Sequence, residues 1–147
     1  IVFVVQDLKE SMWFLLLNRV SLAGFAQSRR YTSPPGEPER KVIMDALRTP
    51  VERALRKRVI FKVDLLKVQA GWAFMRGAPL RSDSSPMDYR GTPYRQLIDD
   101  GMFDDWICAL FHWRGGKWEV VQYVIGATDV VYADWSRRFG APPGIFR

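Results

Sequence analysis

The stretch WICALFHWRGGKWEVVQYVI, residues 106–125, contains two apolar runs joined by Gly115 and Gly116. Paired glycines supply the positive φ angles of a two-residue turn, so the stretch predicts an antiparallel hairpin with strands at 106–113 and 118–125. Alternation along the second strand predicts one face with Trp118, Val120, Gln122 and Val124 and another with Glu119, Val121, Tyr123 and Ile125. Since both faces are partly apolar, the pattern predicts a central strand pair that is covered on both sides.

A second hairpin is predicted upstream of the first. Residues 59–68 are rich in β-branched and apolar side chains, as in a strand. Ala70 and Gly71 predict a tight turn, after which residues 72–75 return as the second strand.

A helix is predicted to precede these strands. Glu37 and Glu39 suit its first turn, because acidic side chains interact favourably with that end of the helix dipole. An apolar stripe at helical spacing follows, formed by Val42, Ile43, Ala46, Leu47, Val51, Ala54 and Leu55. Pro50 interrupts this stripe and predicts an end or a kink in the helix.

Shorter elements complete the chain. Residues 92–98 predict a short helix, since Thr92 can cap a helix and proline is tolerated at the first helical position. A last helix is predicted at 132–138. It is followed by an extended tail from which Ile145 and Phe146 can dock on the core.

The predicted order of elements defines the fold class. A helix followed by an antiparallel meander indicates an α+β fold, because glycine-turn hairpins join antiparallel strands only. We expect a helix packed on a curved antiparallel sheet, of the cystatin or nuclear-transport-factor-2 kind by analogy.

Composition divides the chain into three segments. Residues 28–38 are rich in proline, glycine and serine and predict a linker or exposed loop, and residues 39–147 predict the α+β domain. Residues 1–27 predict an N-terminal strand pair. Residues 1–9 resemble residues 59–67, either through a partial duplication or because short β-rich segments resemble one another by composition.

Composition also excludes several classes of protein. The chain of 147 residues is 48% hydrophobic, which is enough to bury a core and excludes a disordered protein. Its net charge of +6 favours weak attraction to anions. The single cysteine, Cys108, excludes an intrachain disulfide, and one cysteine with one histidine excludes a Cys/His metal site. No phosphate-binding loop is present, so we expect neither a metal nor a cofactor. The apolar run at 12–17 is too short to span a bilayer, so we expect no transmembrane segment.

An aromatic and acidic group near the C-terminus is the first candidate site. Aromatic walls with a few carboxylates suit a small polar ligand or a peptide, so we expect this group to line the mouth of a groove. Its members are Tyr123, Asp129, Tyr132, Asp134 and Trp135. A packed C-terminal helix is the alternative interpretation.

An acidic pocket is a second hypothesis, in which the protein is a small enzyme. Asp104 and Asp105 could supply the carboxylates and His112 is the only histidine that could act as a base. No nucleophile motif accompanies them, and loop capping also explains the acids. The enzyme hypothesis requires the three side chains to converge in one pocket.

A basic run provides the third hypothesis, weak nucleic-acid binding. Arg53, Arg56, Lys57 and Arg58 could neutralise phosphates, and such binding weakens steeply with salt. Acidic residues lie among them, as on an ordinary solvated helix, so we do not expect nucleic acid to be the partner.

Several motifs resemble a known family. GWAF at 71–74, FDDWICAL at 103–110 and YVIGATDV at 123–130 resemble a family of small uncharacterised bacterial proteins, as do YADW at 132–135 and GAPPGIF at 140–146. The resemblance covers residues 36–146. Members are commonly exported, which implies a periplasmic or other extracytoplasmic location. No activity is assigned to the family, so the resemblance implies no catalytic residue.

The expected function is therefore a non-enzymatic binding or interaction module of the cell envelope. Such a module would act through its groove or by adding an exposed sheet edge to a partner, which would be a protein or a small molecule. Pairing of two sheet edges in a homodimer is an alternative. The enzyme and the nucleic-acid binder remain the competing functions.

Overall fold

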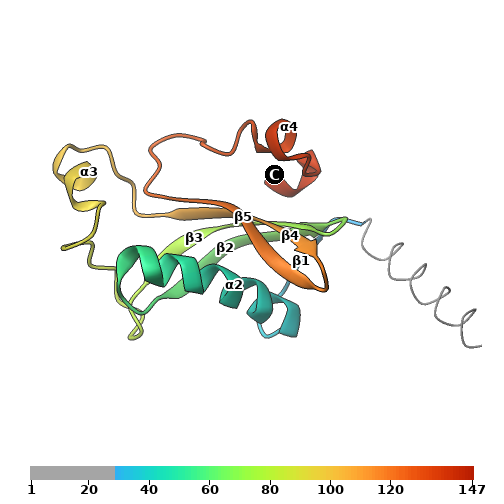
Figure 1. The fold of residues 1–147 in the computed structure, drawn as a ribbon, viewed down its shortest axis with the longest axis horizontal. Coiled ribbons are helices and arrows are strands. Elements are labelled where there is room, and N and C mark those ends of the chain that lie inside the picture. The colour runs from blue at the N-terminus through green and yellow to red at the C-terminus, as the bar shows by residue number, and fades with distance from the viewer. Residues whose placement is uncertain (1–28) are drawn as a thin grey trace, which may run out of the picture.

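Residues 29–147 are described by a computed structural model and form an open, five-stranded antiparallel sheet with helices on both faces (Figure 1). The strands lie in chain order across the sheet. The elements are β1 (Tyr31–Thr32), α2 (Pro38–Leu55), β2 (Ile60–Gln69), β3 (Trp72–Leu80), α3 (Arg95–Asp99), β4 (Ile107–Arg114), β5 (Lys117–Ile125), α4 (Trp135–Phe139) and the 3-10 helix η1 (Pro143–Phe146). The α+β prediction is confirmed. The predicted strand pair at 1–27, and with it the similarity of residues 1–9 to 59–67, lies outside the described residues.

Helix α2 covers one face of the sheet (Figure 1). Pro38 lies in its first turn, where a missing N–H breaks no helical hydrogen bond. The helix continues through Pro50 to Leu55, so it does not end at that proline. Apolar burial on both sides of the proline holds the second half of the helix against the sheet. The buried residues of α2 are Ile43, Met44, Leu47, Val51 and Leu55.

Strand β1 lies within the segment predicted to be a linker or exposed loop. Tyr31 and Thr32 pair with Val68 and Lys67 at one edge of the sheet. The hydroxyl of Tyr31 donates a 2.6 Å hydrogen bond to the carboxylate of Glu39, which ties the strand to α2.

The β2–β3 hairpin is present, and its second strand is longer than predicted. Ala70 and Gly71 form the turn, both with positive φ. β3 pairs with β2 from Trp72 to Leu80 rather than stopping at residue 75. Gly77 and Pro79 both have partners in the ladder with β2.

The β4–β5 hairpin is confirmed, with Gly115 and Gly116 both at positive φ. The predicted alternation along β5 is wrong beyond Val120. The register shifts between Leu110 and Phe111, which leaves Val121 without a partner in β4 as a β-bulge. The bulge moves the next side chains to the other face. Trp118, Val120, Tyr123 and Ile125 therefore all contact the core beneath α2.

The hairpin is covered on both sides, as predicted, but it is not a central strand pair. β5 forms the second edge of the sheet, while β4 lies between β3 and β5. The sequence pattern indicates that both faces of the hairpin are apolar. It does not indicate whether a strand lies at the edge or in the middle of the sheet.

The C-terminal segment packs on the face of the sheet opposite α2 (Figure 1). Ile145 is fully buried and Phe146 packs beside it, which confirms the predicted docking of the tail. The cluster on this face consists of Phe74, Cys108, Leu110, Tyr132, Trp135, Ala141 and Ile145.

Both short helices begin later than predicted. α3 starts at Arg95 rather than residue 92, because the Thr92 hydroxyl donates to the carbonyl of Tyr89 at 2.6 Å and closes a turn. α4 starts at Trp135 rather than residue 132, after a series of turns.

Candidate functional site

The five residues of the predicted ligand groove do not come together. Tyr132 and Trp135 are buried in the cluster opposite α2, as in the packed-helix alternative. Tyr123 contacts the core on the α2 side, because the bulge in β5 turns it to that face. Asp129 and Asp134 are exposed.

The predicted acidic pocket is not formed either. Asp105 accepts a 2.6 Å hydrogen bond from the hydroxyl of Tyr89, whose pKa is raised by burial and by this contact. His112 stacks on Trp72 with ring centroids 3.8 Å apart. Asp104 is exposed. Asp105 precedes β4 and His112 lies near its end, so roughly 20 Å of strand separates the two.

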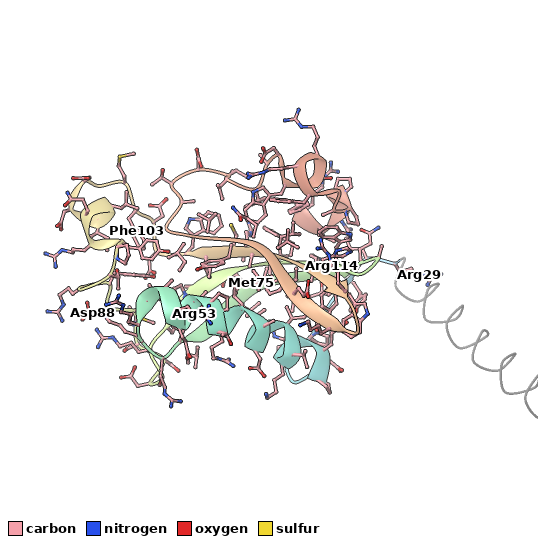
Figure 2. The ribbon with its side chains drawn as sticks, in the orientation of Figure 1. Arg29, Arg53, Met75, Asp88, Phe103 and Arg114 are labelled. Carbon is pink, nitrogen blue, oxygen red and sulfur yellow. The ribbon has the colours of Figure 1, made fainter. Side chains whose placement is uncertain are left out.

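The basic run does not form one helix face. Only Arg53 belongs to α2, and Arg56 follows it as a left-handed C-cap residue. The ammonium of Lys57 donates to the backbone carbonyls of Asp88 and Arg90, so this lysine fixes a loop. Figure 2 shows Arg53 and Asp88 at the same end of the molecule.

A groove between α2 and β5 is a candidate site for a partner, and we call it the α2–β5 groove. Its walls are Ala46 and Pro50 of α2 and residues 117–123 of β5, and they enclose about 510 Å³. Trp118, Val120 and Tyr123 line it from the sheet with largely apolar surface. The hydroxyl of Tyr123 lies near Tyr94, whose pKa is raised by burial first and by Tyr123 second.

The outer backbone edge of β5 borders this groove. Arg114 and Lys117 flank the two-residue turn and form a hydrogen-bonded pair, so Trp113 and Trp118 form the next, non-hydrogen-bonded pair. The N–H of Trp113 accordingly points away from β5 and donates to the carbonyl of Gly71 at 2.7 Å. By the same alternation, the N–H and C=O groups of Trp118 and Val120 point away from β4. Within residues 29–147, no backbone group pairs with this outer edge.

The helical wall of the groove is small and apolar. Ala46 and Pro50 are one turn apart on α2, and Val42, a further turn toward the N-terminus, is 50% exposed. Pro50 has no N–H, so it cannot donate the hydrogen bond that the carbonyl of Ala46 would otherwise accept. The carbonyl of Ala46 therefore lacks its usual helical donor at the point where α2 borders the groove.

The sequence identified one residue of this groove, Tyr123, and missed Ala46, Pro50, Trp118 and Val120 as site residues. The available signal was Pro50 within an amphipathic helix, which marks a weakened turn. The edge position of β5 had no signal, because it depends on the strand order of the whole sheet.

Metal-ligand clusters and membrane-spanning helices are absent from the described part of the chain. Residues 29–147 contain no group of three or more histidine, cysteine or carboxylate side chains arranged to hold a metal ion. No helix in the same range is long and apolar enough to cross a membrane. Comparisons with family models, with curated proteins and with solved structures find no match to this chain.

Proposed function

We propose that the protein is a non-enzymatic binding module that captures an extended peptide segment of a partner protein as an added strand on β5. The observation that carries the proposal is the outer edge of β5, which no strand of residues 29–147 covers and which runs beside an apolar groove bordered by α2. A strand added there extends the sheet from five strands to six.

The geometry provides both affinity and selectivity. The outward N–H and C=O groups of Trp118 and Val120 supply main-chain hydrogen bonds to any peptide in extended conformation. Alternate side chains of that peptide would enter the groove between β5 and the wall formed by Ala46 and Pro50. Apolar side chains fit this surface best, because Trp118, Val120 and Tyr123 line its floor.

A partner segment fits the edge better than a second copy of β5. Val121, at the centre of β5 (Lys117–Ile125), forms the bulge, and a bulge bends its strand and disrupts the ladder. Two β5 strands paired about their centres would bring two such irregularities together. A flexible peptide can adapt to a single bulge.

We place this function in the cell envelope, on the basis of the resemblance to exported bacterial proteins at GWAF, FDDWICAL and YVIGATDV. Fractionation of the cells that produce the protein tests the location, because an envelope module should be released with the periplasmic contents or remain with the cell surface. Recovery in the cytoplasmic fraction alone would contradict this part of the proposal.

An array of unstructured ten-residue peptides tests the binding function. We expect a subset with alternating apolar residues to bind the wild-type protein. Ala46→Trp should abolish binding by filling the groove, whereas Thr49→Trp, on the exposed neighbouring position of the same helix, should bind normally.

A backbone variant provides the second arm of this experiment. Val120→Pro removes an outward N–H without removing a hydrogen bond of the β4–β5 ladder, so it should fold and lose binding. Val120→Thr keeps the N–H and serves as its control. Absence of any bound peptide, or equal binding by Ala46→Trp and wild type, would refute the proposed function.

A further inference from the structure

A second hollow lies where the connection between β3 and α3 meets α3. It encloses about 610 Å³, and we call it the arginine cavity. Its lining includes three arginines and three apolar or aromatic residues, namely Arg81, Arg90, Arg95, Met87, Tyr89 and Ile98. It shares no lining residue with the α2–β5 groove.

The lining of the arginine cavity contains more positive than negative groups. Asp88 and Asp99 are the carboxylates in its lining, against three guanidinium groups. Outside the lining, the ammonium of Lys57 donates to the backbone carbonyls of Asp88 and Arg90. Two carboxylates lie nearby as well: Asp83, whose pKa is lowered first by hydrogen bonds from Ser85 and in part by Arg81, and Asp105, which accepts from Tyr89. An anion that enters the cavity therefore meets more guanidinium groups than carboxylates in the lining.

Guanidinium donors remain free in the cavity. Arg81 approaches Asp88 only to 3.7 Å, and within residues 29–147 its guanidinium has no hydrogen-bond partner. Arg95 uses its Nε on the carboxylate of Asp99, at 3.0 Å, and its Nη groups have no partner in the same range. Guanidinium groups bind carboxylate and phosphate oxygens by paired donors, so these two arginines can share one anionic group.

The floor of the cavity is apolar and held in place. Met87 and Tyr89 are each only 6% exposed. The hydroxyl of Tyr89 donates to Asp105, and its ring packs edge-on against Phe103 with centroids 4.7 Å apart. Ile98 adds an apolar side chain that is 40% exposed. Inorganic anions gain nothing from such a floor, whereas an apolar group on the anion can bury against it.

We propose that the arginine cavity binds a small organic anion, with its carboxylate or phosphate group held by Arg81 and Arg95 and its apolar body on Met87, Tyr89 and Ile98. Asp88 then acts as an internal counter-ion. Its carboxylate accepts three hydrogen bonds from the guanidinium of Arg90, of 3.0, 3.1 and 2.8 Å. An incoming anion competes with Asp88 for the attraction of the same positive charges.

Amide chemical shifts of the full chain, titrated with phenyl phosphate, benzoate and inorganic phosphate, test this proposal. Phenyl phosphate and benzoate should shift the resonances of residues 81–99, and the tighter of the two identifies the preferred head group. Arg95→Ala and Arg81→Ala should each weaken binding about tenfold, since each removes a charged hydrogen bond. Arg137→Ala, an exposed arginine of α4, is the matched control and should leave binding unchanged.

Because Asp88 acts as a counter-ion, its replacement should change the affinity for the anion in the opposite direction. Asp88→Asn keeps the oxygen that accepts from the backbone N–H of Arg90 and removes the competing charge, so it should strengthen binding several-fold. Inorganic phosphate binding as tightly as phenyl phosphate would overturn the proposed apolar contact. No shift with either organic probe, or unchanged binding in Arg95→Ala and Arg81→Ala, would overturn the site itself. Neither result bears on peptide binding at β5.

Discussion

Gly77 in β3 lies so close to the backbone of β2 that no side chain fits at this position. A Cβ at this position would lie 1.9 Å from the carbonyl oxygen of Lys62 in β2, which is backbone and cannot turn aside. Gly77→Ala should therefore reduce the free energy of unfolding by about 3 kcal/mol, measured by urea titration. Gly144→Ala is the control, because its Cβ would meet only flexible side chains, those of Gln69 at 3.1 Å and Arg30 at 3.6 Å. Equal stability of the two variants would contradict the close approach of β2 and β3.

His112 should make stability depend on pH. Its pKa is lowered by burial and by Arg114, with Glu119 acting in the opposite direction. The Nε of Arg114 also donates to Nδ1 of His112 at 2.7 Å, which requires the neutral imidazole. Between the folded and the ordinary pKa the unfolded chain binds more protons, so the free energy of unfolding should fall as the pH falls.

The comparison that isolates this histidine uses His112→Gln. Between about pH 8 and about pH 5, the wild type should lose more stability in urea titrations than this variant. Parallel pH profiles for the two proteins would show that His112 titrates alike in the folded and unfolded chains.

At the scale of elements, Pro50 within α2 links stability to binding. Replacing it by alanine restores an N–H that can donate to the carbonyl of Ala46. Pro50→Ala should raise the free energy of unfolding by about 1–2 kcal/mol and weaken peptide binding at the α2–β5 groove. Urea titration and the peptide array measure the two effects. Tighter peptide binding by the more stable variant would show that the free carbonyl is not used.

The sequence predicted the presence of the β4–β5 hairpin better than it predicted which face of the sheet each side chain occupies. The Gly115-Gly116 turn fixed the β4–β5 hairpin, because two adjacent glycines strongly favour this one kind of turn. The bulge at Val121 left no trace in the sequence, since it is a response of β5 to packing on both faces. As a result, the predicted alternation places Tyr123 on the face opposite Trp118 and Val120, whereas all three contact the same core.

At the scale of the whole molecule, the sheet depends on cover from both sides. Ile145 is fully buried against the face opposite α2, far along the chain from the strands it covers. Ile145→Ala should lower the free energy of unfolding by about 2–4 kcal/mol in urea titration. Val130→Ala, at a site that is 60% exposed, should change it by less than about 0.5 kcal/mol. A small effect at Ile145 would mean that the C-terminal segment does not stabilise the sheet.

The two sites proposed here are products of the assembled fold. The α2–β5 groove joins a helix to a strand some seventy residues later in the chain, and the edge of β5 is defined only by the strand order. The arginine cavity gathers side chains from a loop and from α3 whose charges, read along the sequence, alternate like those of any solvated surface. Sequence patterns therefore predicted the α+β class, and tertiary packing determines where the two proposed sites lie.

Backbone amide hydrogen exchange at Trp118 and Val120 is the most direct test of strand capture by β5. Both N–H groups should exchange rapidly in the free protein, while the amide of Glu119, paired with His112 in the ladder, exchanges slowly. A peptide selected on the array should slow exchange at Trp118 and Val120 by at least roughly tenfold. If the two amides are already protected in the free protein, or remain fast with the peptide bound, β5 is not the edge that captures a strand.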